Sequence, residues 1–463
     1  MTKWASTAFG EPLTIDSKKM VNEIRQRVSQ PIHPNFDTDF NIFRFVLNAE
    51  RGHKNRKDVI EHATKGLNQH LRLRKCLRLD EMPDIPFSDN PLFQRRYLPC
   101  GKIDEETDRA NRLLWFIEYE TISVEVSEQS SLSSQPPFSI LLMECEAPKR
   151  VAISFGSSST CSDESTNRSV HFGQLNEEAT GRLSSLRHIV DMNNYEINPF
   201  TMLFVSSGTL SYYSNLFHYE NYPELVNPIE MVNIAKWIHM PYKLIKTMMP
   251  AGFTDRFRLH DGHFLPALQS EIDLEHIPVT LGGKNPEQKC TPAVKLPQSE
   301  YWTVPQPEIV KALHPLNISA RKVKYFRIEV NEVPKTLSWY FTTDGDVYFG
   351  VFYEPHNQNK VTSGKHEKEE FDLDTKEMVY PWLKLTAKLV HEFDAIHCTR
   401  PGVYYVAFGN KHSWVMARHI DVMIQVTDDT QTSKCYTDGR QETLNDSTAH
   451  IVEQLKLQAH PTH

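Results

Sequence analysis

The sequence predicts an α/β domain with a helical lobe before it and an all-β sandwich after it. Three observations support this fold class. Residues 17–80 repeat apolar side chains at helical spacing, residues 186–235 follow a strand, helix, strand pattern, and residues 323–426 change to a period of two. A strand–helix–strand unit requires parallel strands under covering helices. We therefore expect a mixed or parallel sheet covered by helices, followed by antiparallel strands.

The composition indicates a globular protein. The 463 residues are enough for two or three cores, and the 39 % hydrophobic and 24 % charged content is ordinary. A net charge of −8 gives no general attraction to nucleic acid, so we expect no such partner. No apolar run is long enough to span a bilayer, and the N-terminus lacks the apolar run of a signal peptide. These features predict a cytoplasmic protein.

No motif of catalysis or metal binding stands out. The seven cysteines are scattered without a CxxC pair, and neither GxSxG nor HExxH occurs. The segments 260–263 (HDGH) and 344–346 (DGD) contain residue types that bind metals, but a polar loop explains the first better and a hairpin turn explains the second better. We therefore predict a binding protein with no catalytic residues, no cofactor and no metal.

The helical lobe is predicted to cover residues 17–90 and to be basic. Its cations are consistent with ordinary solvated helix faces, or with a surface that faces anionic lipid. A segment rich in proline and aspartate, Glu81–Pro91, ends the lobe. The apolar faces consist of Phe40, Phe43, Val46 and Leu47, and of Val59, Ile60, Ala63, Leu67 and Leu71.

The α/β domain is predicted to cover residues 91–283. A helix is expected to begin at Asn198–Pro199, and the Ser-rich segments 123–137 and 154–169 are expected to be loops. Gly282–Gly283 closes the domain and lacks the pattern of a phosphate-binding loop. The expected strands are Arg112–Ile122, Leu186–Met192, Ile229–Ala235 and Phe257–His260.

Residues 240–250 (MPYKLIKTMMP) form a short predicted helix with two different sides. At about 100° per residue, Lys243 and Lys246 fall on one half. One interpretation is an ordinary helix that covers a core. The other is a gate over an apolar cavity, since flexible methionines tolerate changing contacts. The apolar half, which would line the cavity, contains Met240, Leu244, Ile245, Met248 and Met249.

A lipid ligand would need such a gate. Burying about thirty methylenes of a diacyl lipid contributes roughly 20–25 kcal/mol, at about 0.8 kcal/mol each. A closed cavity therefore releases lipid only if a gate opens where hydrocarbon replaces water, at a membrane. Lys243 and Lys246 would then flank the apolar side of the opened helix and contact headgroups. The pattern predicts peripheral membrane docking through these two lysines.

The C-terminal half is predicted to contain a linker, residues 284–315, a sandwich, residues 316–428, and a loose polar tail, residues 429–463. Six prolines mark the linker, and a helical turn is expected near Ile451–Leu457. Asp344–Gly345 is expected to form a hairpin turn. The expected strands are Val323–Val330, Leu337–Phe341, Val347–Tyr353, Val403–Phe408 and Ile420–Val426.

Two parts of the sequence resemble known families. The segments HYENYPELVNPIEMVNIAKWIHMPYKLIKTMMP, FTDRFRLHD and LEHIPVTLGG resemble the CRAL-TRIO lipid-binding family, in its branch of phosphatidylinositol transfer proteins. The segments LSWYFTTDGDVYFGVFY and PGVYYVAFGNKHSWVMARHIDVMIQV are similar to the GOLD (Golgi dynamics) domain. The combination resembles the supernatant protein factor family.

The CRAL-TRIO resemblance implies a headgroup site. The glutamate of the Tyr-Pro-Glu turn is Glu224, and the basic residue of the phosphoinositide site falls at Arg256, in place of the usual lysine. A basic pair of the family falls near Glu50–Arg51, where only one residue is basic. The alternative is a Glu224–Arg256 salt bridge that caps the sheet edge.

The resemblance implies a non-enzymatic, gated lipid-transfer protein that docks peripherally on membranes. Its ligand would be phosphatidylinositol or another lipid that the cavity shape selects. The alternative function is a lipid-sensing adaptor in trafficking or signalling that binds a protein partner through the GOLD domain.

Overall fold

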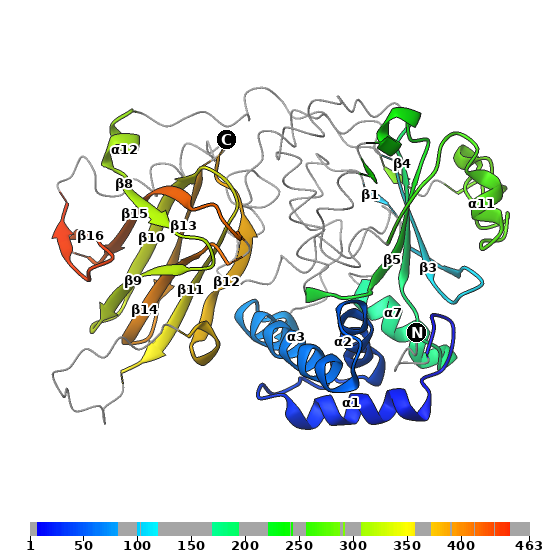
Figure 1. The fold of residues 1–463 in the computed structure, drawn as a ribbon, viewed down its shortest axis with the longest axis horizontal. Coiled ribbons are helices and arrows are strands. Elements are labelled where there is room, and N and C mark those ends of the chain that lie inside the picture. The colour runs from blue at the N-terminus through cyan, green and yellow to red at the C-terminus, as the bar shows by residue number, and fades with distance from the viewer. Residues whose placement is uncertain are drawn as a thin grey trace.

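The structure is a computed structural model. It describes residues 7–81, 100–101, 103–118, 169–193, 221–240, 242–243, 256–287, 290–291, 307–356, 372–388, 391–411, 413–429 and 431–444. The predicted helix after Asn198 and most of the Ser-rich segments lie outside these residues, as does the turn at 451–457. Figure 1 shows the C-terminal β-strands on one side, the α/β sheet on the other, and the helical lobe below.

The helical lobe consists of three helices, α1 (Ile15–Arg27), α2 (Asp39–Gly52) and α3 (Arg56–Cys76), followed by the 3₁₀ turn η1 (Leu79–Glu81). A polar residue caps each start: Thr14, Thr38 and Asn55 each accept a hydrogen bond from a backbone N–H three residues on. The predicted faces pack as one core, with Phe43, Val46, Val59 and Leu67 fully buried. The prediction of helices in this region is confirmed.

The α/β domain contains a five-stranded mixed sheet in the order β2-β3-β4-β5-β6. β2 (Ile103–Thr107) is antiparallel to β3 (Leu113–Glu118), whereas β3, β4 (Leu186–Asp191), β5 (Val226–Val232) and β6 (Phe257–Leu259) are parallel. The prediction of a mixed or parallel sheet is thus confirmed. Helix α7 (Ser169–Thr180) precedes β4, and a small sheet pairs β1 (Cys100–Gly101) with β7 (Cys290–Thr291).

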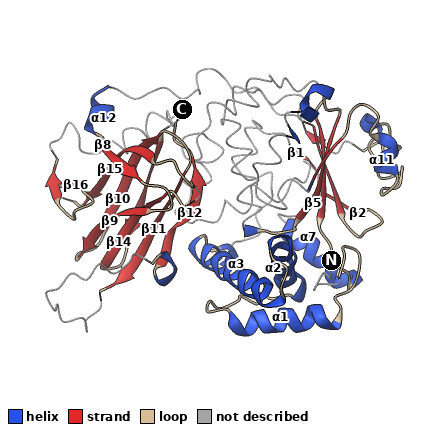
Figure 2. Cartoon of the chain, viewed as in Figure 1, coloured by secondary structure: helices blue, strands red, loops and turns tan. Residues whose placement is uncertain are grey.

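The strand predicted at Ile229–Ala235 begins earlier in the structure, at Val226, and ends at Val232. The sequence signal started after Pro228, because proline normally interrupts a strand, but Val226 already pairs with Leu186 of β4. One face of the sheet packs on α11 (Leu265–Gln269) and η5 (Val279–Leu281), visible at the outer edge in Figure 2. The other face carries Val190 and Ile229, which pack with Ile238 of η3 (Lys236–Ile238).

The C-terminal module contains two antiparallel sheets. One has the order β12-β11-β14-β9, and the other has the order β13-β10-β15-β16-β17 with β8 also paired to β15. The sheets share one core, in which Trp339 and Phe341 contact Phe349 at ring distances of 5.2 and 4.9 Å. The strands are β8 (His314–Ile318), β9 (Val323–Val330), β10 (Lys335–Thr343), β11 (Val347–Pro355), β12 (Glu377–Leu385), β13 (Glu392–Cys398), β14 (Gly402–Gly409), β15 (Arg418–Thr427), β16 (Thr432–Cys435) and β17 (Gln441–Thr443).

Three sequence predictions need correction in this module. Asp344–Gly345 is not a hairpin turn, because β10 and β11 on either side of it pair with different sheets. The predicted linker contains α12 (Pro307–Ala312) and the start of β8. The predicted loose tail contains β16 and β17, since Thr432 and Cys435 bury their side chains at the edge of β15. Two buried positions in a polar segment give too weak a period to be recognised from sequence.

The helical lobe packs directly on the C-terminal module (Figure 1). Leu73 of α3 and Leu77, the residue after the helix, join the apolar cluster that contains Met378 of β12. Arg72 donates hydrogen bonds to the carbonyl oxygens of Leu373, in η7 (Leu373–Thr375), and Lys376, at 2.6 and 2.7 Å. The lobe therefore contacts the C-terminal module through α3, in addition to the α/β domain. Within the described residues, no helix is long and apolar enough to cross a membrane.

Candidate functional site

The structure brings Glu224 and Arg256 together at the edge of the α/β sheet that is formed by the amino ends of its parallel strands. Glu224 lies two residues before β5, and Arg256 lies one residue before β6. Because β5 and β6 are parallel neighbours, their amino ends meet at the same sheet edge. Arg51, in the last turn of α2, approaches this edge from the helical lobe. Three distant segments of the chain thus form one charged cluster.

Glu224 is the centre of this cluster. Its Oε1 and Oε2 accept hydrogen bonds from Arg51 Nε and Nη2 at 2.7 and 2.8 Å, the bidentate geometry of a strong arginine–carboxylate pair. Oε1 also accepts from Arg256 Nη2 at 3.2 Å, and Oε2 accepts from Asn227 Nδ2 at 2.7 Å. The contact with Arg256 is the longest of the four. We call Arg51, Glu224, Asn227 and Arg256 the edge cluster.

The electrostatics keep Glu224 ionised at neutral pH. Its side chain is 1 % exposed, and burial by itself would raise the pKa of the carboxyl. The charge of Arg256 and the hydrogen bonds from Arg51 and Asn227 outweigh that effect, so the pKa of Glu224 is lowered. Arg256 is buried as well, whereas the Arg51 side chain is 26 % exposed. The cluster therefore reaches the surface through Arg51.

The backbone at Glu224 is in the left-handed region, with φ of 59°. A side chain other than glycine, asparagine or aspartate rarely adopts this conformation. The turn is closed by a hydrogen bond from Leu225 N to Tyr222 O at 3.3 Å. Such a backbone persists where its surroundings hold it, and here two arginines and Asn227 fix the carboxylate. The Tyr-Pro-Glu turn thus presents its acidic side chain in one defined orientation.

The sequence predicted Glu224 and Arg256 as a pair, and named Arg51 as a nearby contributor. All three meet in the structure, but their role in ligand binding stays a prediction. The salt bridge of the alternative interpretation is present between Arg256 and Glu224. Asn227 was missed. Its place three residues after Glu224, just inside the strand, was the available signal.

The predicted gate lies mostly outside the described residues. Met240 is 80 % exposed, and Lys243 is exposed as well. In this conformation Met240 faces solvent. Leu244, Ile245, Lys246, Met248 and Met249 are outside the described residues, so their roles in the gate and in docking stay predictions.

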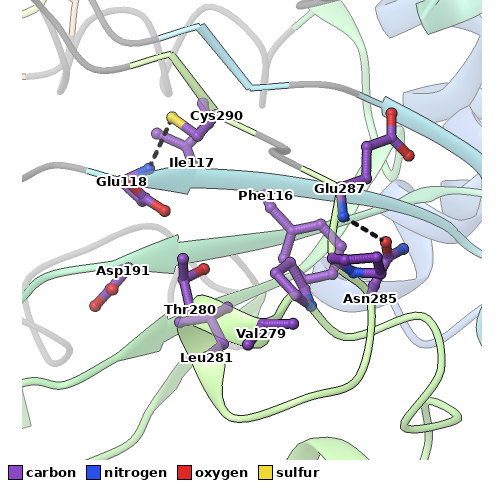
Figure 3. A pocket seen from close by; sticks show the side chains of 12 residues that line it. Phe116, Ile117, Glu118, Asp191, Val279, Thr280, Leu281, Asn285, Glu287 and Cys290 are labelled. Carbon is purple, nitrogen blue, oxygen red and sulfur yellow. Dashed lines mark hydrogen bonds between the residues drawn. The ribbon is translucent and has the colours of Figure 1, made fainter.

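A small pocket lies at the opposite edge of the same sheet, which is formed by the carboxyl ends of its parallel strands (Figure 3). Its volume is about 140 Å³, and it is bounded by Glu118 and Asp191, the last residues of β3 and β4. Val279 and Leu281 line it from η5, and Cys290 lies beside Glu118, whose backbone N–H donates to the cysteine Sγ at 3.3 Å. A cavity of this size admits a molecule like benzene. It is far too small for the two acyl chains of a phospholipid.

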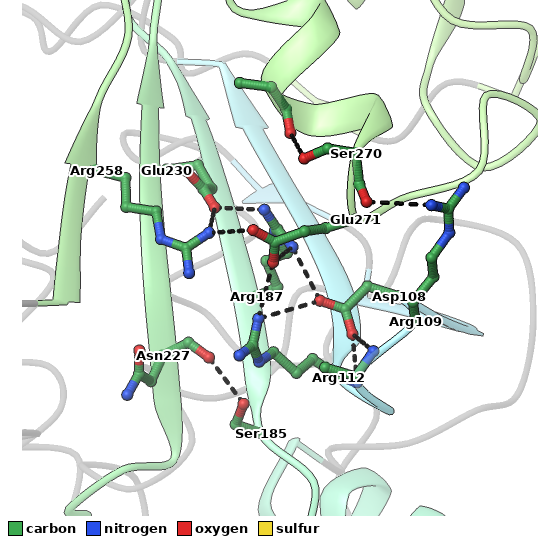
Figure 4. A network of polar contacts seen from close by, with 12 residues as sticks. Asp108, Arg109, Arg112, Ser185, Arg187, Asn227, Glu230, Arg258, Ser270 and Glu271 are labelled. Carbon is green, nitrogen blue, oxygen red and sulfur yellow. Dashed lines mark hydrogen bonds and ion pairs between the residues drawn. The ribbon is translucent and has the colours of Figure 1, made fainter. Parts of the chain in front are cut away.

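A second charged cluster crosses the middle of the sheet (Figure 4). Arg187 of β4 is fully buried and forms ion pairs with three carboxylates, Asp108 at 3.0 Å, Glu230 at 2.5 Å and Glu271 at 2.7 Å. Burial would lower the pKa of Arg187, but these carboxylates outweigh it and raise the pKa. Arg258 also bonds to Glu230 and Glu271. We call these five residues the sheet cluster.

Three parts of the chain match the models of known domain families. Residues 103–283 match the CRAL/TRIO domain model. Members of the CRAL/TRIO family are generally lipid-binding or lipid-transfer proteins rather than enzymes. Residues 13–82 match a domain of unknown function, DUF8435. Residues 300–434 match the model described as "F28H7_8_C:-like, C-terminal domain".

Two proteins and one solved structure are similar to this chain. The chain is 23 % identical over 402 residues to "CRAL-TRIO domain-containing protein F28H7.8" of Caenorhabditis elegans, covering 86 % of this chain and 87 % of that protein. It is 22 % identical over 218 residues to "Protein ctg-1" of the same organism, covering 45 % of this chain and 54 % of that protein. Among solved structures, Sfh5 matches with 14 % identity and a TM-score of 0.33, covering 59 % of this chain and 87 % of that one.

Proposed function

We propose that this protein is a non-enzymatic lipid-transfer protein that holds one lipid in its CRAL/TRIO domain and exchanges it at membranes. The edge cluster is the observation that supports this proposal best. It places a carboxylate and two guanidinium groups from distant segments together inside the domain that matches a lipid-binding family. The protein would work in the cytoplasm as a peripheral membrane protein.

The proposed ligand is phosphatidylinositol, with its headgroup at Arg256 and Glu224. A guanidinium binds phosphate through two parallel N–H groups, more specifically than a lysine does. The hydrogen bond from Arg256 to Glu224 is the longest that Glu224 accepts, at 3.2 Å. A phosphate could therefore replace this contact at Arg256 with little loss of binding energy. Glu224 would orient Arg256 and accept hydrogen bonds from inositol hydroxyl groups.

The proposed gate is the helix at residues 240–250. Met240, Leu244, Ile245, Met248 and Met249 would line the lipid cavity when the gate is closed, and Lys243 and Lys246 would contact headgroups. The exposure of Lys243 in the structure is consistent with this role. The exposed Met240 would belong to the part of the helix that first meets the membrane.

For the C-terminal module we propose a GOLD-type sandwich. The support is a four-stranded and a six-stranded antiparallel sheet around one aromatic core. We propose residues 316–428 as its central part, with the strands β16 and β17 added at one edge. Its contact with α3 favours a second candidate function, a lipid-sensing adaptor that binds a protein partner through this module. An adaptor would keep its lipid, whereas a transfer protein moves it between vesicles.

Native mass spectrometry of the purified protein tests the ligand. We expect co-purified phosphatidylinositol, and a spectrum without any lipid would contradict the proposal. Transfer between vesicles then tests the site, with Arg256→Ala compared with Arg109→Ala, a surface arginine paired with Asp273 at 3.0 Å. Arg256→Ala should lose phosphatidylinositol transfer and keep phosphatidylcholine transfer. Equal loss of both would assign the edge cluster a structural role.

A further inference from the structure

The loop between β14 and β15 holds three consecutive large apolar side chains in solvent. Trp414, Val415 and Met416 are 80 %, 87 % and 65 % exposed. Single exposed apolar residues are common on protein surfaces, but three in succession at the end of a sandwich form a contiguous patch. Together with residues 319–322, which contact this loop, we call it the tip.

The tip is a fixed structure. Asn410 is buried, and its Nδ2 donates to Ile318 O and Met416 O at 3.1 and 2.9 Å. The backbone N–H of Arg321 donates to Asn410 O at 2.9 Å, and that of Asn410 donates to Lys322 O at 2.9 Å. These bonds tie the two loops together. The loop conformation therefore holds the apolar side chains in solvent, although the hydrophobic effect favours their burial.

The loop is closed further by Ser413. Its Oγ donates to Met416 O at 2.6 Å and accepts from the backbone N–H of Met416 at 3.0 Å. The guanidinium of Arg321 lies 4.0 Å from the centre of the Trp414 ring, which is a cation–π contact. The tip thus combines an aromatic ring with a cation at its outermost point.

The charged side chains within the two tip segments are all positive. The segments 319–322 and 410–417 contain Arg321, Lys322 and Lys411 and no aspartate or glutamate. Lys324 lies two residues after the first segment, and Arg418 directly follows the second. Asp346, at the base of this end, forms an ion pair with Lys384 at 3.2 Å. In a protein of net charge −8, this basic group is a local feature that selects an anionic contact.

We propose that the tip is a second membrane-docking element that inserts Trp414, Val415 and Met416 into the interface of an anionic bilayer. Tryptophan prefers the headgroup level of a membrane, and valine and methionine are suited to the acyl boundary below it. Arg321, Lys322 and Lys411 would then lie at the level of acidic headgroups, where each cation strengthens binding about fivefold. A stable protein interface buries roughly 800 Å² on each partner. Three side chains at the end of one loop form a smaller contact, which favours a membrane over a protein as the partner.

This inference concerns the C-terminal module and does not depend on which lipid fills the CRAL/TRIO domain. It gives the chain two contacts with one membrane. Two weak contacts on one molecule bind more tightly than either one alone when both can reach the membrane together. Removal of the tip should therefore weaken membrane binding and leave the co-purified lipid unchanged.

Co-sedimentation of the full chain with vesicles tests the proposal. The variant Trp414→Ala/Val415→Ser/Met416→Ser should lower affinity for phosphatidylcholine vesicles that contain phosphatidylserine by about tenfold or more, since it removes the side chains that would insert. The control Ile15→Ser changes another exposed aliphatic residue, in the helical lobe, and should have no effect. The altered side chains are exposed, so the melting temperature should be unchanged.

A second pair of variants tests the charges. Lys322→Glu/Lys411→Glu should abolish the preference for phosphatidylserine, whereas Arg109→Glu/Lys284→Glu, with the same change in net charge at exposed positions of the α/β domain, should retain it. Unchanged binding by both tip variants would overturn the proposal and indicate a protein contact instead. Native mass spectrometry of the same variants separates this result from a failure of lipid loading.

Insertion itself has a direct readout. Brominated lipids quench tryptophan fluorescence only at short range. The chain has seven tryptophans, so the quenching of the whole protein is compared with that of Trp414→Phe. A component that Trp414→Phe lacks would place this ring in the bilayer. Equal quenching in the two proteins would overturn insertion at the tip.

Discussion

The edge cluster and the sheet cluster are both buried groups of opposite charges, but they are built in opposite ways. In the sheet cluster, one guanidinium, that of Arg187, bonds to three carboxylates. In the edge cluster, one carboxylate, that of Glu224, bonds to two guanidinium groups. The first joins strands within one domain, and the second joins the helical lobe to the starts of two strands.

The two clusters also differ in solvent access, which limits the role that each can have. Arg187 is closed off from water in the middle of the sheet, so its ion pairs can only hold the strands together. Glu224 lies at the edge, and its partner Arg51 is partly exposed. Under the proposed function, Arg256 would exchange this carboxylate for a phosphate, whereas the Arg187 side chain has no exposed surface. The following predictions test this contrast, from the largest effect to the smallest.

The largest effect is expected from Arg187→Met. It leaves three carboxylates near each other without their shared buried cation, and we expect a loss of about 4 kcal/mol or more in the free energy of unfolding. Denaturant unfolding measures the change. The surface variant Arg109→Met should cost about 1 kcal/mol or less. A loss equally small for Arg187→Met would show that the sheet cluster contributes little to stability.

Glu224→Gln should destabilise less, by about 2–3 kcal/mol. The amide still accepts one hydrogen bond, but Arg51 and Arg256 lose their counter-charge. Thermal unfolding checks this value. Because the cluster joins α2 to the sheet, the variant should also raise hydrogen exchange at the amino ends of β5 and β6. An exchange pattern confined to α2 would contradict the joint role.

Acid pH should distinguish the same variant. The native pKa of Glu224 is lowered below the value near 4.5 expected for the unfolded chain. A lowered native pKa stabilises the fold above the unfolded pKa, and this stability is lost as the pH falls through the native pKa. The wild type should therefore lose stability below about pH 4.5, and Glu224→Gln should lose less over that range. Parallel curves for the two proteins would contradict an ionised Glu224.

Arg256→Ala should change specificity more than stability. We expect phosphatidylinositol transfer to fall about tenfold, as for a lost charge-assisted contact, and phosphatidylcholine transfer to change little. Arg256→Lys should restore part of the activity because the charge remains. A fluorescent-lipid transfer assay with each lipid measures the ratio. No rescue by lysine would argue against a phosphate contact.

The smallest effect is expected from Lys243→Glu/Lys246→Glu. Reversing two local charges should slow transfer to anionic vesicles several-fold, with much less change for neutral vesicles. Added salt should reduce the difference, because exposed charges are screened within about 10 Å at 0.1 M salt. Stopped-flow transfer at two salt concentrations checks both statements. An unchanged rate at low salt would place docking elsewhere, first at the tip.

The sequence alone determined the local elements of this protein. The three helices of the lobe follow from apolar residues at helical spacing, and the strands near 113, 186 and 323–426 follow from β-branched and aromatic runs. The pairing of Glu224 with Arg256 also came from the sequence, through the family resemblance. The helix and strand signals are local, because each depends on residues within one or two turns or along one strand, whereas the pairing of two residues 32 positions apart needed the family pattern.

Only the tertiary structure decided which elements meet. Asp344–Gly345 has the local pattern of a hairpin, yet the chain passes from one sheet to the other there, because Trp339 and Phe341 of one sheet pack on Phe349 of the other. Asp108 and Arg187 are 79 residues apart, and no sequence pattern near either residue predicts that they meet in the sheet cluster. The exposure of Trp414 is likewise invisible in the sequence. Burial and charge pairing are properties of contacts between distant segments, and a single sequence records them only through the fold.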